Sequence, residues 1–186
     1  MTRDAIIVPL KRFDRAKDRL RSAGSKNVSA LAEELARGVL AHCAPRHVII
    51  VSESGDIAEF ARQLGCEVWR SPARNLNEAV QNAYDGLSPR FDQLIVVHGD
   101  LVAPEGIGLF APEPGVTIVT DRHERGTNVL ALPTHLDFHF AYGADSALLH
   151  QREAQRLGVA CGVITGSPWG HDIDEPDDLQ VRPDGI

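Results

Sequence analysis

The chain has 186 residues, of which 43% are apolar, and this size and composition are typical of a soluble globular domain with one substantial core. We therefore predict a single domain over residues 1–186. Acidic residues outnumber basic ones by 26 to 19, which gives a formal net charge of −7 at pH 7. This balance argues against a nucleic-acid surface, so a small anionic ligand would need a local basic patch or a metal ion.

The three cysteines are far apart in the sequence, with no CxxC pair and no histidines nearby at zinc-finger spacing. This pattern indicates buried thiols in a reducing compartment. The apolar run Ala5–Leu10 is too short for a signal peptide or a membrane span, and no other run approaches the length needed. We expect a cytoplasmic protein that does not enter a membrane.

Apolar runs and helical patterns alternate along the first half of the chain. Three short apolar runs predict strands, over Ala5–Val8, His47–Val51 and Cys66–Trp69. Three further stretches predict helices, over Asn27–Ala41, Asp56–Leu64 and about Asn77–Asp85. Ser29 is the expected N-cap of the first helix, and Gly65 and Gly86 are the expected ends of the other two.

The central strand of the prediction is Leu94–Val97, four apolar residues with no polar interruption, which is the pattern of a strand buried on both faces. The strand runs into His98, Gly99 and Asp100. Ligands collect at the carboxyl ends of strands in an open parallel sheet, so Asp100 is well placed to hold a metal ion against a phosphate. The alternative is a turn aspartate that caps the next short helix.

The alternation continues after the central strand. Strands are predicted over Val116–Thr120, Thr127–Leu132 and Val159–Ile164, the first two close enough in sequence to be antiparallel. Helices are predicted over Gly106–Phe110, as a single turn, and over Ala144–Leu157. A succession of strand and helix with crossovers of this length implies an α/β fold of three layers around a mostly parallel mixed sheet.

A basic segment follows the first strand. It places six cations between Pro9 and Ser22 of an otherwise acidic chain, namely Lys11, Arg12, Arg15, Lys17, Arg19 and Arg21. The segment leaves the carboxyl end of a strand, where a nucleotide would lie, and the chain has neither GxxxxGK[ST] nor GxGxxG, so phosphates would be held by side-chain cations and metal. The alternative is a solvated basic face paired with Asp14 and Asp18.

Two further clusters offer polar groups. Asn75-Leu76-Asn77 opens a helix, and an asparagine there either caps the helix or reads a base or ribose edge. Asp121–Asn128 places Gly, Thr and Asn at the start of a strand, where N–H groups and a hydroxyl suit a phosphate or carboxylate, although such a cluster is also a common turn.

The start of the last long helix is a third candidate anion site. Gly143 and Ser146 lie where the first N–H groups of the helix are unpaired and its dipole is positive. Capping by Asp145 or Ser146 is the alternative and is compatible with anion binding. His150, four residues after Ser146, would share its face, either pointing to the site or lying on the surface.

The acidic stretch His171–Leu179 is the most informative part of the sequence. If it is extended, Asp172 and Asp174 point the same way and Ile173 turns into the core. Joined by Asp100, these carboxylates would form a cage of hard oxygen ligands for Mg²⁺. A solvated acidic tail is the alternative, but it would not require the interruptions by Ile and Pro.

Taken together, these segments resemble the 2-phospho-L-lactate guanylyltransferase family and its bacterial phosphoenolpyruvate guanylyltransferase kin, which act in coenzyme F-420 biosynthesis. The resemblance extends from about Ile7 to Leu179. Its motifs are Lys11 with Ala16-Lys17-Asp18-Arg19-Leu20, Asn75-Leu76-Asn77, Asp100-Leu101, Gly126-Thr127-Asn128, Gly143 with Ser146 and His150, and Asp172-Ile173-Asp174 with Pro176 and Asp178-Leu179. The family usually has Pro after Asp-Leu, where this chain has Val102.

The resemblance implies a Rossmann-like nucleotidyltransferase fold of the GT-A type. It also implies GTP and a phosphorylated three-carbon acid as substrates, a guanylylated acid and pyrophosphate as products, and Mg²⁺ as cofactor. The implied metal ligands are Asp100, Asp172 and Asp174. The implied nucleotide-binding residues are Lys11, Lys17 and Arg19 at the triphosphate and Asn77 near the nucleoside. The implied acid-binding residues are Thr127, Gly143 and Ser146. The implied catalytic residues are Lys11, Lys17 and Asp100.

Two other functions stay open at this point. A nucleotidyltransferase for a sugar phosphate or a molybdenum-cofactor precursor would share the fold, but those families usually carry a glycine-rich loop after the first strand, which this chain lacks. The second open function is that of a regulatory domain that binds a nucleotide without turning it over. The sequence does not choose among 2-phospho-L-lactate, phosphoenolpyruvate and 3-phosphoglycerate. The preference for GTP rests on resemblance alone, and a homodimer is left open.

Overall fold

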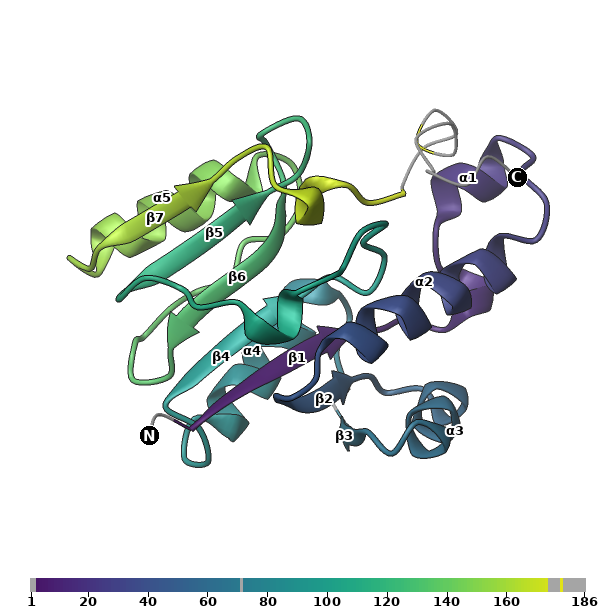
Figure 1. The fold of residues 1–186 in the computed structure, drawn as a ribbon, viewed down its shortest axis with the longest axis horizontal. Helices are drawn as coiled ribbons and strands as arrows, with labels where there is room; N and C mark the ends of the chain where they lie inside the picture. Colours follow the sequence, from purple (N-terminus) through teal and green to yellow (C-terminus); the bar gives the residue numbers. More distant parts are fainter. Residues whose placement is uncertain (1–2, 71, 174–177, 179–186) are drawn as a thin grey trace.

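A mixed sheet of seven strands in the order β3-β2-β1-β4-β6-β5-β7 forms the centre of the computed structural model (Figure 1). The strands are β1 (Asp4–Pro9), β2 (His47–Val51), β3 (Glu67–Trp69), β4 (Gln93–Val97), β5 (Val116–Thr120), β6 (Thr127–Pro133) and β7 (Cys161–Ile164). Strand β6 is antiparallel to β4 and β5, and the other neighbouring pairs are parallel. The predicted α/β class with a mostly parallel mixed sheet is confirmed. The structure describes residues 3–70, 72–173 and 178, with the backbone alone for Asp18 and Arg19.

Helices cover both faces of the sheet and complete the predicted three layers. They are α1 (Asp18–Ser22), α2 (Val28–His42), α3 (Gly55–Gln63), α4 (Leu76–Leu87) and α5 (Ser146–Arg156), with short 3₁₀ turns η1 (Phe13–Arg15), η2 (Ile107–Leu109) and η3 (Pro168–Gly170). Helices α4 and α5 pack in the apolar cluster of one face, and α2, α3 and η2 pack in that of the other. Figure 1 shows α2 crossing in front of the sheet near β1 and β2. No helix in the described part of the chain has the length and apolar character needed to cross a membrane.

The central strands β1 and β4 are apolar at successive positions because helices cover both faces of the sheet there. In β4, Leu94 and Val96 face the cluster of α4 and α5, whereas Ile95 and Val97 face the cluster of α2 and α3. All four side chains are fully buried. The prediction that this run is a strand buried on both faces is confirmed, and its carboxyl end delivers His98, Gly99 and Asp100 to one edge of the sheet.

Several predicted boundaries are wrong for identifiable reasons. Helix α5 begins at Ser146 and not at Ala144, because Asp145 takes a left-handed conformation with φ of 57°. Helix α4 includes Gly86 and ends at Leu87. A Cβ atom at position 86 would lie 2.3 Å from the Trp69 ring, so only glycine fits there. Glycine therefore serves close helix-to-sheet approach here and not helix termination.

The N-terminal cap of α2 is also different from the expected one. Asn27, with φ of 57°, occupies the cap position and makes no side-chain capping bond. The hydroxyl of Ser29, which we expected to cap the helix, accepts a hydrogen bond from Arg21 at 2.8 Å. The start of α2 is thus tied to the basic segment, which places that segment against the body of the fold.

Candidate active site

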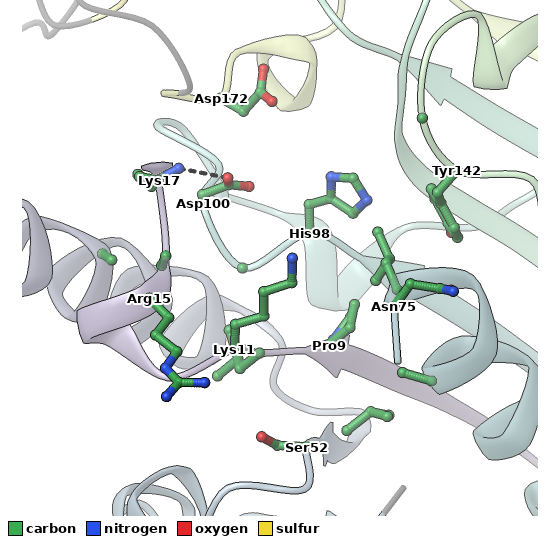
Figure 2. A pocket seen from close by; sticks show the side chains of 18 of the residues that line it. Pro9, Lys11, Arg15, Lys17, Ser52, Asn75, His98, Asp100, Tyr142 and Asp172 are labelled. Carbon is green, nitrogen blue, oxygen red and sulfur yellow. Dashed lines mark hydrogen bonds and ion pairs between the residues drawn. The ribbon is translucent and has the colours of Figure 1, made fainter. Parts of the chain in front are cut away.

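A cavity of about 1150 Å³ opens at the carboxyl edge of the parallel strands (Figure 2). The loops that follow β1, β2 and β4 line one part of it, and the first residues of β6 and α5 line another. Because β6 runs antiparallel to β4, its first residue meets the last residues of β4 at this edge. The volume lies slightly above the range of about 300–1,000 Å³ that is usual for small-molecule sites.

The ion pair of Lys17 and Asp100 lies in this cavity (Figure 2). The ammonium of Lys17 donates to Asp100 Oδ2 at 2.7 Å and also to the backbone carbonyl of Ile173. The Lys17 side chain is 4% exposed and that of Asp100 is 24% exposed. Burial opposes ionisation of Asp100, but the positive charge of Lys17, together with His98, outweighs it and lowers the pKa of the carboxyl below its ordinary value.

The segment around Asp172 is joined directly to the loop after β4. Leu101 and Asp172 form an antiparallel β-bridge, and the N–H of Val102 donates to the carbonyl of His171 at 2.9 Å. Ile173 is fully buried in a small apolar cluster, which confirms that it turns into the core. Asp100 and Asp172 therefore line the same cavity although they are 72 positions apart, from 100 to 172.

Val102 supplies a backbone hydrogen bond that a proline at this position could not donate. We expect Val102→Pro to lower the free energy of unfolding by about 1 kcal/mol, because it removes the N–H that holds His171. Urea unfolding monitored by circular dichroism measures the change. Val102→Ala keeps the N–H and is the matched control, and a Pro variant as stable as the Ala variant would contradict the prediction.

The carboxylates of the cavity suit a magnesium ion. Asp100 Oδ1 is buried and accepts no hydrogen bond within the described part of the chain, so one hard oxygen is left for a cation. Asp172 adds a second carboxylate to the same cavity. Within residues 3–70, 72–173 and 178, no three acidic, histidine or cysteine side chains gather closely enough to enclose a metal ion. Asp174, the third predicted ligand, lies outside the described residues, so the three-carboxylate site stays a prediction.

The cations of the basic segment divide into two groups. Lys11, Arg15 and Lys17 line the cavity, and Figure 2 shows the Lys11 side chain reaching into it below His98. Lys11 is exposed and makes no ion pair within the described residues. These three side chains place positive charge where an anionic ligand would enter, as the position of the segment after β1 predicts.

Two of the other cations, Arg12 and Arg21, have partners within the segment. Arg12 pairs with Asp14 at 2.8 Å, as the solvated-face alternative requires, although it also borders the cavity. Arg21 donates to the carbonyls of Phe13 and Ala16, which fixes the loop before α1. Arg19 belongs to α1, but its side chain lies outside what the structure describes, so its role at the triphosphate stays a prediction.

The three residues predicted to receive the acid lie on one wall of the cavity, formed by the starts of β6 and α5. Thr127 and Ser146 are each 2% exposed. Gly143 has φ of 130°, a conformation that side chains rarely adopt, so glycine is needed in this loop. The structure thus brings Thr127, Gly143 and Ser146 together.

The first N–H groups of α5 are less open than the sequence suggested. The N–H of Ser146 donates to the Gly143 carbonyl at 3.3 Å, and that of Ala147 donates to the Arg125 carbonyl at 3.0 Å. Both donors are used within the protein. Side chains of this wall are therefore better placed to receive an anion than these two backbone groups are.

The two asparagines at the start of α4 have structural hydrogen bonds. The side chain of Asn75 accepts from the Glu78 N–H at 3.0 Å, which confirms the capping alternative for Asn75. Asn77 donates to the Tyr142 carbonyl at 3.1 Å and accepts from the Tyr142 N–H at 2.6 Å. Asn75 and Leu76 line the cavity, and Asn77 lies behind them. Both ends of the Asn77 amide thus hold the loop that carries Gly143.

Three residues of the site received no role from the sequence. His98 and Tyr142 line the cavity with ring centroids 5.3 Å apart, and Arg125 and Asp145, which also line it, form an ion pair at 2.7 Å. His98 follows β4 directly, so the strand-end rule that selected Asp100 also applied to it. Arg125 lay in the candidate stretch Asp121–Asn128, in which Asp121 accepts from two backbone N–H groups as a turn aspartate does.

An α/β sheet with a cation-rich, carboxylate-bearing cavity at its carboxyl edge is the arrangement that a nucleotidyltransferase requires, and the family match below assigns the chain to that class. The structure is similar to that of a nucleotidyl transferase from Methanothermobacter thermautotrophicus, with a TM-score of 0.67 at 18% identity over 99% of this chain and 97% of that one. The sequence model of the family described as "Guanylyl transferase CofC like" matches residues 4–181. The chain belongs to this family.

Relatives with assigned names agree with the family. The chain is 32% identical to the phosphoenolpyruvate guanylyltransferase of Sphaerobacter thermophilus, over 94% of this chain and 89% of that protein. It is 28% identical to the 3-phospho-D-glycerate guanylyltransferase of Colwellia psychrerythraea, over 96% and 90%. It is also 28% identical to the 2-phospho-L-lactate guanylyltransferase of Methanothermobacter thermautotrophicus, over 93% and 81%. The resemblance drawn from the motifs is confirmed.

Proposed function

We propose that the protein transfers GMP from GTP to a phosphorylated three-carbon acid, in a step of coenzyme F-420 biosynthesis that releases pyrophosphate. The observation that carries the proposal is that one cavity holds both the cations of the basic segment and the wall of Thr127, Gly143 and Ser146. Two anionic substrates can therefore lie side by side. The names of the relatives supply the candidate acids, phosphoenolpyruvate, 2-phospho-L-lactate and 3-phosphoglycerate.

The proposed reaction is an in-line displacement at phosphorus. An oxygen of the acid's phosphate forms a bond to the α-phosphorus of GTP, and the bond from that phosphorus to the oxygen bridging the β-phosphate breaks. Pyrophosphate leaves with the electron pair. The attacking oxygen is already charged at neutral pH, so no strong general base is required. The protein must instead align two polyanions and reduce their repulsion.

The described side chains divide this work between them. Lys11, exposed and aimed into the cavity, would bind the triphosphate, and Lys17 would add its charge beside Asp100. By lowering the pKa of Asp100, Lys17 keeps the carboxylate ionised. Asp100 and Asp172, with Asp174, would hold Mg²⁺, which neutralises phosphate charge when bound.

Pyrophosphate release tests the proposal. The enzyme is incubated with MgCl₂, GTP and each candidate acid in turn, and the guanylylated product is identified by mass spectrometry. We expect release with one or more of the three acids, faster with GTP than with ATP or CTP, and its loss when EDTA removes the metal. Release with a sugar phosphate and not with an acid would assign a different nucleotidyltransferase, and binding of GTP without release would assign a regulatory domain.

We also propose a cytoplasmic location. Cys43, Cys66 and Cys161 are all free thiols, and burial raises the pKa of each. Unpaired thiols persist in reducing compartments. Fractionation of cells that produce the protein tests the location.

A further inference from the structure

His150 lies directly behind the acid-binding wall and bonds through both ring nitrogens. It is fully buried on α5. Its Nδ1 is 3.0 Å from the hydroxyl oxygen of Thr127, and its Nε2 accepts from the Ala141 N–H at 3.0 Å. The sequence had left His150 either in the site or on the surface. It is instead one layer behind the cavity.

The two partners determine which nitrogen carries the proton. A backbone N–H can only donate, so Nε2 must present its lone pair to Ala141. Burial lowers the pKa of His150 to about 4, so the ring is neutral at pH 7. The single ring proton is therefore on Nδ1, where it is donated to the Thr127 oxygen.

This tautomer determines the direction of the Thr127 hydroxyl. An isolated hydroxyl rotates between donating and accepting, but the Thr127 oxygen already accepts from His150. Within the described residues that oxygen has no other hydrogen-bond partner. Thr127 is 2% exposed and lines the cavity, so its O–H is left to donate to a group in the cavity.

We propose that His150 is a positioning residue, which holds the Thr127 hydroxyl as a hydrogen-bond donor to an anionic oxygen of the acid substrate. The proposal rests on the proposed function, because it takes the acid to lie at this wall. A packing role alone is the competing account, since the ring contacts Tyr142 with centroids 4.9 Å apart. Packing explains the burial of the ring, but it does not require the proton on Nδ1.

Two amide substitutions separate the hydrogen bonds of the ring. Asn at position 150 has an N–H near the place of Nδ1 and no atom at Nε2, so His150→Asn keeps the bond to Thr127 and loses the one to Ala141. His150→Gln reaches the place of Nε2 and loses the donor at Nδ1. We expect His150→Gln to raise the KM for the acid about 10-fold or more, since the lost bond orients a donor to a charged group, with the KM for GTP changed less than about twofold. His150→Asn should stay within about threefold for both substrates.

A double variant at positions 127 and 150 tests whether the two residues act through one hydrogen bond, which a packing role alone would not require. Thr127→Val keeps the shape and removes the hydroxyl, so it should raise the acid KM as His150→Gln does. The double variant should lose no more than either single one, because both remove the same donor. Additive losses, or equal losses in His150→Asn and His150→Gln, would overturn the positioning role.

The tautomer can be measured without any turnover. In wild-type protein labelled with nitrogen-15 histidine, the His150 ring at pH 7 should show a protonated Nδ1 and an unprotonated Nε2 in two-dimensional NMR spectra. A protonated Nε2 would overturn the inference even if the enzyme is active with an acid. Conversely, the expected tautomer in a protein that binds none of the acids would count against the proposed function, and the positioning role would fall with it.

Discussion

Asp100→Asn is expected to lower turnover by about 10²-fold to 10³-fold while the protein remains folded. Asn keeps the size of the side chain and an oxygen for Lys17, but it lacks the negative charge that both Lys17 and a divalent cation need. The buried Oδ1 of Asp100, which accepts no hydrogen bond in the described part of the chain, is the atom whose loss should matter most. Initial rates of pyrophosphate release at saturating GTP and acid measure the effect.

Asp14→Asn is the matched control for Asp100→Asn. Asp14 pairs with Arg12 and is half exposed, and it is not among the residues that line the cavity. The control variant should keep its rate within about twofold, since exposed ion pairs contribute little. Unchanged turnover in Asp100→Asn would remove Asp100 from the mechanism.

The difference in stability between the wild-type protein and Asp100→Asn should depend on pH. Folding lowers the pKa of Asp100 from the ordinary 3.8, so its ionised carboxylate stabilises the folded state at higher pH. This contribution is lost as the pH falls through the folded-state value, and the Asn variant never has it. The stability gap between wild type and Asp100→Asn should therefore be constant near neutral pH and narrow as the pH falls below about 4 in urea unfolding experiments.

Lys17→Met is expected to reduce both turnover and stability, whereas Lys11→Met should raise the KM for GTP and leave stability unchanged. Met keeps the length of the lysine chain and removes the charge. At position 17 the loss leaves Asp100 without its cation and the Ile173 carbonyl without its donor. We expect turnover to fall about 10²-fold, and the free energy of unfolding to fall by about 1–3 kcal/mol.

Lys11→Met is the comparison that separates these two effects. Lys11 is exposed and has no ion pair within the described residues, so its loss should raise the KM for GTP without changing the urea midpoint. Thermal and urea unfolding of both variants, together with GTP titrations, measure the contrast. Equal stability of the two variants would show that the Lys17 pair does not hold the site together.

The sequence predicted the strands and the site edge because both depend on local patterns. A strand covered by helices on both faces must be apolar at successive positions, and Leu94–Val97 shows this directly. The residues just past such a strand lie at the ligand-binding edge, which led to Asp100. The same rule placed the basic segment after β1, where Lys11 and Lys17 do line the cavity.

Contacts between distant parts of the chain were not predictable in the same way. Asn77 bonds to Tyr142, which is 65 positions away, and no local pattern shows that both ends of its amide are used. The backbone N–H groups of Ser146 and Ala147 likewise donate to carbonyls of loops that come near only when the chain folds. The general rule that the first groups of a helix are free to bind a ligand therefore does not hold at these positions.

The sequence by itself determined the α/β class, the strand ends that bear charge and the family, because each is written in short runs of residues and their order. Only the tertiary structure decided the insertion of β6 between β4 and β5, the joining of Asp172 to Asp100 through Leu101 and Val102, and the burial of His150 behind Thr127. These depend on pairings between segments that are far apart in the chain, and such pairings are chosen by the packing of the whole core.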